Sequence, residues 1–182
     1  MRFSNSILVV AILLAFSGSV SAFAGGVSGG GGFVINPLAP QYPQNLEYTK
    51  RLIHKSTHDL EDFVLWKKNK WKQEGVPAEM KSIYTKLFEN SKRDLLHVAD
   101  HIDIHIEDAG PCLTFEGLPV DGSINSKPGT VCVSAKTFSE RVSYEDTSRQ
   151  AIALSLHELS EIVGLTETEA VQLQVEVLKD LQ

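Results

Sequence analysis

The sequence predicts a single α+β domain over residues 45–182, and changes in hydrophobic periodicity carry that prediction. Apolar residues recur at helical spacing from Asn45, alternate with polar residues from His101, and return to helical spacing from Ser143. Strands grouped between two helical segments are typical of an α+β fold. We therefore expect two long N-terminal helices, a small and mostly antiparallel sheet, a motif-bearing helix and a C-terminal helix.

The N-terminal segment that precedes this domain shows two compositional patterns. Residues 1–22 carry one charge, Arg2, then an apolar core and a small-residue stretch ending at Ala22, which is the pattern of a secretory signal peptide. Residues 23–44 are rich in glycine and proline, and such a segment gains too little to offset the entropy of being fixed. We expect a cleaved signal peptide, a flexible leader and a secreted or periplasmic protein.

Charge and hydropathy exclude two classes of partner. The chain has 17 basic and 23 acidic residues, and its net charge of −6 becomes −7 when cleavage removes one basic residue, Arg2. So acidic a chain has no electrostatic footprint for nucleic acid. No segment supplies the ~20 apolar residues of a membrane span, so none is expected. A protein or peptide partner of unknown identity stays open.

Two helices are expected before the sheet. Residues 45–72 place apolar side chains on one stripe with charged residues between them, and residues 73–76 break the pattern. Pro77 suits a first helical position, and a second stripe then continues to Val98. The apolar positions are Ile53, Leu60, Phe63, Val64 and Trp71, followed by Met80, Ile83, Tyr84, Leu87, Phe88, Leu95 and Val98.

The central segment predicts three short strands and a disulfide. Residues 101–107 alternate between polar and apolar, and residues 112–115 and 130–134 are short runs bounded by turn residues. Cys112 and Cys132 are the only cysteines, and export would place them in an oxidising compartment where pairing is expected. Their bridge would join the second strand to the third and contribute about 3 kcal/mol by restricting the unfolded chain.

The last part of the sequence predicts two helices with defined ends. Ser143 and Asp146 form a capping-box-like start for a helix that Gly164 terminates. Thr166 with Glu169 forms a second capping box, which opens the C-terminal helix. The expected buried face of the first of these helices is Ile152, Leu156, Leu159 and Val163.

A short motif lies at the end of the helix that begins near Ser143. Residues 157–167 read His-Glu-Leu-Ser-Glu-Ile-Val-Gly-Leu-Thr-Glu. This stretch resembles the zincin motif H-E-x-x-H, with Glu161 where that family has its second histidine. The resemblance implies a metal-dependent peptidase in which His157 and Glu161 bind the ion, Glu167 is a third ligand, and Glu158 is the general base. Positions four apart share a helix face, so His157 and Glu161 can contact one ion.

The acidic ligand set changes the expected chemistry. Two carboxylates and one imidazole would neutralise a divalent cation, which leaves it a weaker Lewis acid than an ion held by several histidines. Oxygen ligands also shift the preference from zinc toward harder ions such as manganese. The expected cofactor is therefore one divalent metal ion, and the protein is either a peptidase or a non-catalytic relative of one.

Other interpretations stay open from the sequence alone. If Glu158 and Glu161 face solvent, the motif is a coincidence, and the chain is then a non-enzymatic secreted or envelope interaction protein. A second cluster of histidines and acids, between His97 and Glu107, is either a source of metal ligands or the solvated face of an edge strand.

Overall fold

The computed structural model describes residues 45–89, 94–124 and 129–182; the predicted signal peptide and leader, residues 1–44, lie outside them. Helices and two small sheets make up this part of the chain, which confirms the α+β class. The helices are α1 (Leu46–His58), α2 (Leu60–Glu74), α3 (Lys81–Phe88), α4 (Leu95–His101), α5 (Ala135–Arg141), α6 (Thr147–Val163) and α7 (Glu167–Asp180), with 3-10 turns at Ala78–Met80 and Tyr144–Asp146. The strands are β1 (Asp103–Glu107), β2 (Cys112–Leu113), β3 (Pro119–Val120), β4 (Gly122–Ile124) and β5 (Thr130–Ser134).

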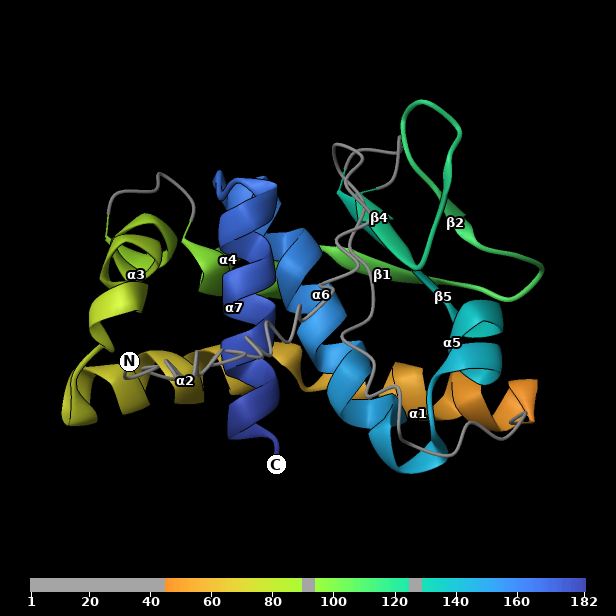
Figure 1. Cartoon of the computed structure of the whole chain (residues 1–182), viewed down its shortest axis with the longest axis horizontal. Coiled ribbons are helices and arrows are strands. Elements are labelled where there is room, and N and C mark those ends of the chain that lie inside the picture. Colours follow the sequence, from red (N-terminus) through yellow and green to blue (C-terminus); the bar gives the residue numbers. More distant parts are fainter. Residues whose placement is uncertain (1–44, 90–93, 125–128) are drawn as a thin grey trace, which may run out of the picture.

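The N-terminal helical segments are more interrupted than the sequence predicts. The helix expected over residues 45–72 breaks at Asp59, whose φ of −96° and ψ of 20° depart from helical geometry. Aspartate favours such positions because its side chain competes for backbone hydrogen bonds. α1 and α2 therefore follow one another along one side of the molecule (Figure 1). The second expected helix, from Pro77 to Val98, consists of a 3-10 turn, α3 and the start of α4, with residues 90–93 outside the described part.

The main sheet has the strand order β1-β5-β4, and β2 pairs with β3 in a separate hairpin. The β4–β5 and β2–β3 pairings are antiparallel, as predicted, whereas the longest pairing, β1 with β5, is parallel. A parallel pair requires a long connection, and here the hairpin and β4 lie within it. The Cys112–Cys132 disulfide joins β2 to β5, which confirms the predicted pairing of the cysteines.

Helix α5 has no counterpart in the sequence prediction. Ser134 ends β5 and also caps α5, since its side chain accepts a hydrogen bond from the backbone N–H of Thr137. A helix of seven residues is too short to establish a helical period against its surroundings. The 3-10 turn after it, capped by Ser143, then leads into α6.

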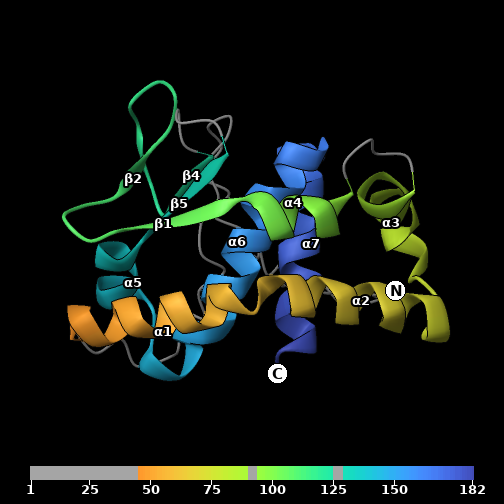
Figure 2. The same ribbon diagram turned by 180° about the vertical axis from the view of Figure 1, so that it is seen from behind.

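Helix α6 is the central element of the domain. It packs against α7 on one side and against α1, α4 and the main sheet on the other (Figures 1 and 2). Gly122 of β4 permits the close approach of the sheet, because a Cβ atom there would lie 3.0 Å from the side chain of Leu154. Every residue from Ala153 to Ser160 is buried. The polar side chains of this stretch are therefore enclosed by protein, unlike those of an ordinary surface helix.

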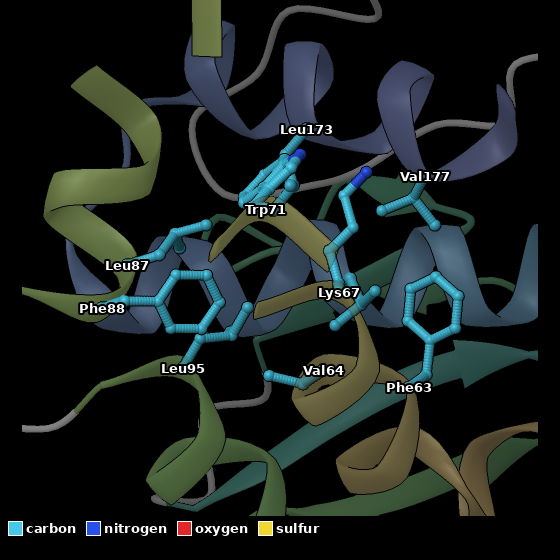
Figure 3. A pocket seen from close by; sticks show the side chains of 10 residues that line it. Phe63, Val64, Lys67, Trp71, Leu87, Phe88, Leu95, Leu173 and Val177 are labelled. Carbon is cyan, nitrogen blue, oxygen red and sulfur yellow. The ribbon is translucent and has the colours of Figure 1, made fainter. Parts of the chain in front are cut away.

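A small cavity lies in the apolar core between α2 and α7 (Figure 3). Its volume of about 10 Å³ is no more than one water molecule needs. Trp71, Leu87 and Leu173 are among the residues that line it. It is therefore a gap in side-chain packing rather than a ligand pocket.

Candidate metal site

The three metal ligands predicted from the motif converge in the folded chain. His157 and Glu161 come from the last turns of α6, and Glu167 is the first residue of α7. One possible ligand atom from each of the three lies within 4.8 Å of the other two. His157 Nε2 lies 3.4 Å from Glu167 Oε2, which is an ion-pair distance and longer than a good hydrogen bond. This group of side chains could hold a metal ion.

A tight turn after α6 brings the chain back toward His157. Gly164 has a φ of 108°, in the left-handed region that side chains disfavour. Its N–H donates to the carbonyl of Glu161 at 2.9 Å, and the N–H of Leu165 donates to the carbonyl of Ser160 at 3.0 Å. This pair of bonds is a Schellman motif. The glycine-terminated helix end that the sequence predicts is confirmed.

The predicted capping box starts α7 at Glu167. The side chain of Thr166 accepts from the N–H of Glu169, and the carboxylate of Glu169 accepts from the N–H of Thr166. Lys86 of α3 also donates to both oxygens of this carboxylate. The contact between Lys86 and Glu169 could not be predicted from local sequence patterns, because the two residues are 83 positions apart in the chain.

Several polar atoms at this site are buried without a hydrogen-bond partner among the described residues. They are both ring nitrogens of His157 and one carboxylate oxygen each of Glu161 and Glu167. Buried polar atoms nearly always have a partner, so such a cluster requires an explanation. Imidazole nitrogen and carboxylate oxygen are common ligands of zinc and manganese. A divalent cation would give a partner to one ring nitrogen of His157 and to one oxygen of each glutamate, and the second ring nitrogen would still need a hydrogen-bond partner.

The site is acidic, and its charged groups shift one another's pKa values. Burial raises the pKa of Glu161 to about 7; the nearby His157 acts to lower it, and the carboxylate of Glu167 acts to raise it. Burial lowers the pKa of His157, but Glu167, Glu158 and Glu161 outweigh that effect, so this pKa lies above the ordinary value of 6.5. A bound cation would reduce the repulsion between the carboxylates.

Metal binding requires only a small closure of the three side chains. Ligands of four-coordinate zinc lie about 2.0–2.2 Å from the ion, and therefore about 3.4 Å from one another. The contact between His157 and Glu167 already has this length. Glu161 and Glu167 are partly exposed, whereas His157 is completely buried.

Glu158, the residue expected to be the general base, is completely buried. Its charge acts on His157 closely enough to raise the pKa of the imidazole. The alternative in which Glu158 faces solvent is therefore wrong, whereas Glu161 is partly exposed. The role of Glu158 in catalysis stays a prediction.

The second cluster of histidines and acids, between His97 and Glu107, lies largely exposed to solvent. His101 and His105 keep more than half of their side-chain area exposed, at 60% and 52%. The ring centroids of His97 and His101 lie 4.1 Å apart on α4, with the ring planes tilted by 38°. Across residues 45–89, 94–124 and 129–182, the group formed by His157 and its two glutamates alone brings three possible ligand atoms together. The solvated-strand interpretation of the segment fits these exposures.

No known protein family, curated protein or solved structure matches this chain. Among the helices that the structure describes, none is both long enough and apolar enough to span a membrane. The chemistry of the site itself must therefore support any functional proposal.

Proposed function

We propose that this protein binds one divalent metal ion through His157, Glu161 and Glu167. The observation that carries the proposal is the convergence of three ligand atoms, each from a side chain that has a buried polar atom with no hydrogen-bond partner in the described part of the chain. Two of the ligands lie four residues apart on α6, and the third arrives through the Schellman turn. The partial exposure of the two carboxylates leaves room for a water ligand, as in open metal sites.

The ligand set favours zinc or a harder ion such as manganese. Two carboxylates and one neutral imidazole balance the charge of a divalent cation. Manganese prefers oxygen ligands such as these carboxylates to sulfur ligands or to a set of several imidazoles. The raised pKa of Glu161 adds a pH dependence, because the carboxyl must lose its proton before it binds metal.

A metal-dependent peptidase is the second candidate, and Glu158 is the observation that favours it. Glutamate next to the first ligand is the general-base position of the zincin motif, and Glu158 acts electrostatically on His157. A bound ion would supply a polarised water for hydrolysis. The charge-neutral ligand set weakens that polarisation, so we place metal binding first and hydrolysis second.

Export from the cell belongs to the same proposal. The signal-peptide pattern of residues 1–22 and the Cys112–Cys132 disulfide both suit an oxidising compartment. N-terminal sequencing of the protein recovered outside the cytoplasm should begin at Phe23. An intact N-terminus at Met1 in that protein would contradict cleavage of the signal peptide, and recovery of the protein only from the cytoplasm would contradict export.

Metal content of the purified protein tests the binding proposal. The mature protein is purified without chelator, supplied with zinc or manganese, and freed of excess metal before elemental analysis. We expect one ion per chain in the wild type and none in the His157→Ala variant. A wild type without bound metal would contradict the proposal.

A matched control separates this site from adventitious binding to surface histidines. The double variant His97→Ala with His101→Ala removes the neighbouring pair of histidines on α4 and should keep one ion per chain. Loss of the ion in this variant, with retention in His157→Ala, would assign the metal to the surface instead.

Peptide hydrolysis is tested separately through Glu158→Gln. This variant should keep its metal and lose hydrolysis of an unstructured protein such as casein. Equal hydrolysis by wild type and variant would remove Glu158 as the base. If the metal-loaded wild type cleaves no peptide, the peptidase proposal is contradicted and only the metal-binding proposal stands.

A further inference from the structure

We propose that Lys86 and Glu169 position Glu167 for metal binding, a role that rests on the proposed function of the site. Lys86 Nζ lies 2.6 Å and 2.8 Å from the two carboxylate oxygens of Glu169. Lys86 belongs to α3, whereas Glu169 lies in the first turn of α7, two residues after Glu167. The ion pair therefore attaches the start of α7 to a different helix.

Glu169 transmits this attachment to the backbone around Glu167. One oxygen of its carboxylate accepts hydrogen bonds from the N–H of Thr166 at 2.9 Å and from the hydroxyl of Thr166 at 3.0 Å. Thr166 directly precedes Glu167, and the N–H of Glu169 donates back to its hydroxyl at 3.4 Å. Glu167 is thus enclosed in a capping box whose carboxylate is held by Lys86.

Glu167 needs such support more than the other two ligands do. His157 and Glu161 project from α6, which is packed on several sides. Glu167 begins a helix, and the ends of helices fray unless their backbone groups are tied. Its carboxylate must also approach the acidic site against the charge of Glu161. Groups that orient a metal ligand typically change metal affinity by about 10-fold to 100-fold when removed.

The charge of Lys86 makes the positioning role testable. The positive charge of a lysine repels a nearby metal cation. If Lys86 acts only through this repulsion, its removal should tighten metal binding. If Lys86 acts by holding Glu169 and the start of α7, its removal should weaken binding. The two roles therefore predict opposite signs for the same substitution.

The experiment is a calorimetric titration of the mature protein with Zn²⁺, comparing wild type, Lys86→Met, Lys86→Arg and Lys136→Met. We expect Lys86→Met to bind about 10-fold more weakly and Lys86→Arg to recover most of the affinity, because arginine can also hold both carboxylate oxygens. Lys136→Met, which removes an exposed lysine paired with Glu140, should bind as the wild type does. Circular dichroism of each variant at the titration temperature checks that it is folded.

A spectroscopic measurement adds evidence that a loss of general stability would not produce. Co²⁺ in place of Zn²⁺ has a visible spectrum that depends on its ligands. The spectrum of folded, metal-saturated Lys86→Met should differ from that of the wild type and resemble that of Glu167→Gln, because both lose the same ligand contact.

The possible failures are distinguishable from one another. Unchanged or tighter Zn²⁺ binding by Lys86→Met would overturn the positioning role and leave the metal site intact. Equal weakening by Lys136→Met would overturn it too, since the effect would not be specific to the pair with Glu169. A wild type that binds no Zn²⁺ or Mn²⁺ would instead contradict the proposed function itself.

Discussion

The two ends of α7 hold their carboxylates in different ways. At the C-terminal end, Asp180 is almost buried and accepts hydrogen bonds from both Lys67 and Lys70. At the N-terminal end, Glu167 and the neighbouring Glu161 form no ion pair with a lysine or arginine of the described residues. Asp180 therefore has two permanently charged lysines as partners, whereas Glu161 and Glu167 have, among the described residues, only the titratable His157 nearby.

The carboxyl pKa values at the two ends are shifted in opposite directions. Burial acts to raise the pKa of Asp180, but the hydrogen bonds from Lys67 and Lys70 reverse that effect and lower it below 3.8. Burial raises the pKa of Glu161 to about 7, and His157 does not reverse it. The lysines at the C-terminal end thus favour the ionised form of Asp180, whereas the surroundings of Glu161 favour its protonated form. The metal ion that we propose would be the counter-charge of the N-terminal end.

Removing a counter-charge from the C-terminal end should have the largest effect. Lys67 is 3% exposed, lies over the ring of Trp71, and extends toward α7 between Trp71 and Val177 (Figure 3). Lys67→Ala leaves Asp180 with one lysine and a cavity beside it, so we expect a loss of about 3 kcal/mol in the free energy of unfolding. Urea denaturation measures this loss.

The control at this end is Lys70→Ala. Lys70 keeps 31% of its side-chain area exposed. Its replacement leaves the contact between Lys67 and Asp180 in place. We expect this substitution to destabilise the protein clearly less than Lys67→Ala does, because exposed ion pairs contribute little to stability. Equal effects of the two substitutions would show that burial of Lys67 does not set the strength of its pair.

The N-terminal end should instead make stability depend on pH. Between about pH 4.5 and pH 7 the folded chain retains a proton on Glu161 that the unfolded chain has released, so the metal-free protein becomes less stable as the pH rises. The raised pKa of His157 extends this loss above 6.5. The lowered pKa of Asp180 affects stability only in more acidic solution.

Urea denaturation in the presence of EDTA, at several values between about pH 5 and pH 8, measures this dependence. The Glu161→Gln variant should show a weaker decline over the lower part of the range. A wild type whose stability rises with pH across the range would contradict the electrostatic description of this end.

An exposed pair gives the smallest expected effect. Lys136 and Glu140 lie four residues apart on α5, and both side chains are about half exposed. Lys136→Met should change the free energy of unfolding by less than about 0.5 kcal/mol, measured in the same way. A larger loss would mean that exposed carboxylates in this protein also depend on a counter-charge.

The sequence predicts the N-terminal end of α7 better than the C-terminal end. Gly164, Thr166 and Glu169 are local signals of a helix end and a capping box, and each does in the structure what its type and spacing predict. The spacing of His157 and Glu161 on one helix is also local. Their approach to Glu167 could be anticipated because only a short turn separates the residues.

Contacts between distant segments could not be predicted in this way. Lys67 and Asp180 are 113 residues apart, and nothing near either residue indicates its partner. The parallel pairing of β1 with β5 likewise depends on how the intervening hairpin folds. The complete burial of Glu158 follows from the packing of α6 on several sides, which helical periodicity does not predict for a stretch with polar residues.

The effect of Glu161→Gln on stability, with and without metal, tests most directly whether the missing counter-charge is a metal ion. In EDTA at about pH 8, the neutral amide should make the variant more stable than the wild type by about 1 kcal/mol, after discounting for the partial exposure of Glu161. With saturating Zn²⁺ the order should reverse, because the wild type gains the free energy of binding and the variant gains less. A variant that is less stable in EDTA, or an order that Zn²⁺ does not change, would contradict the account.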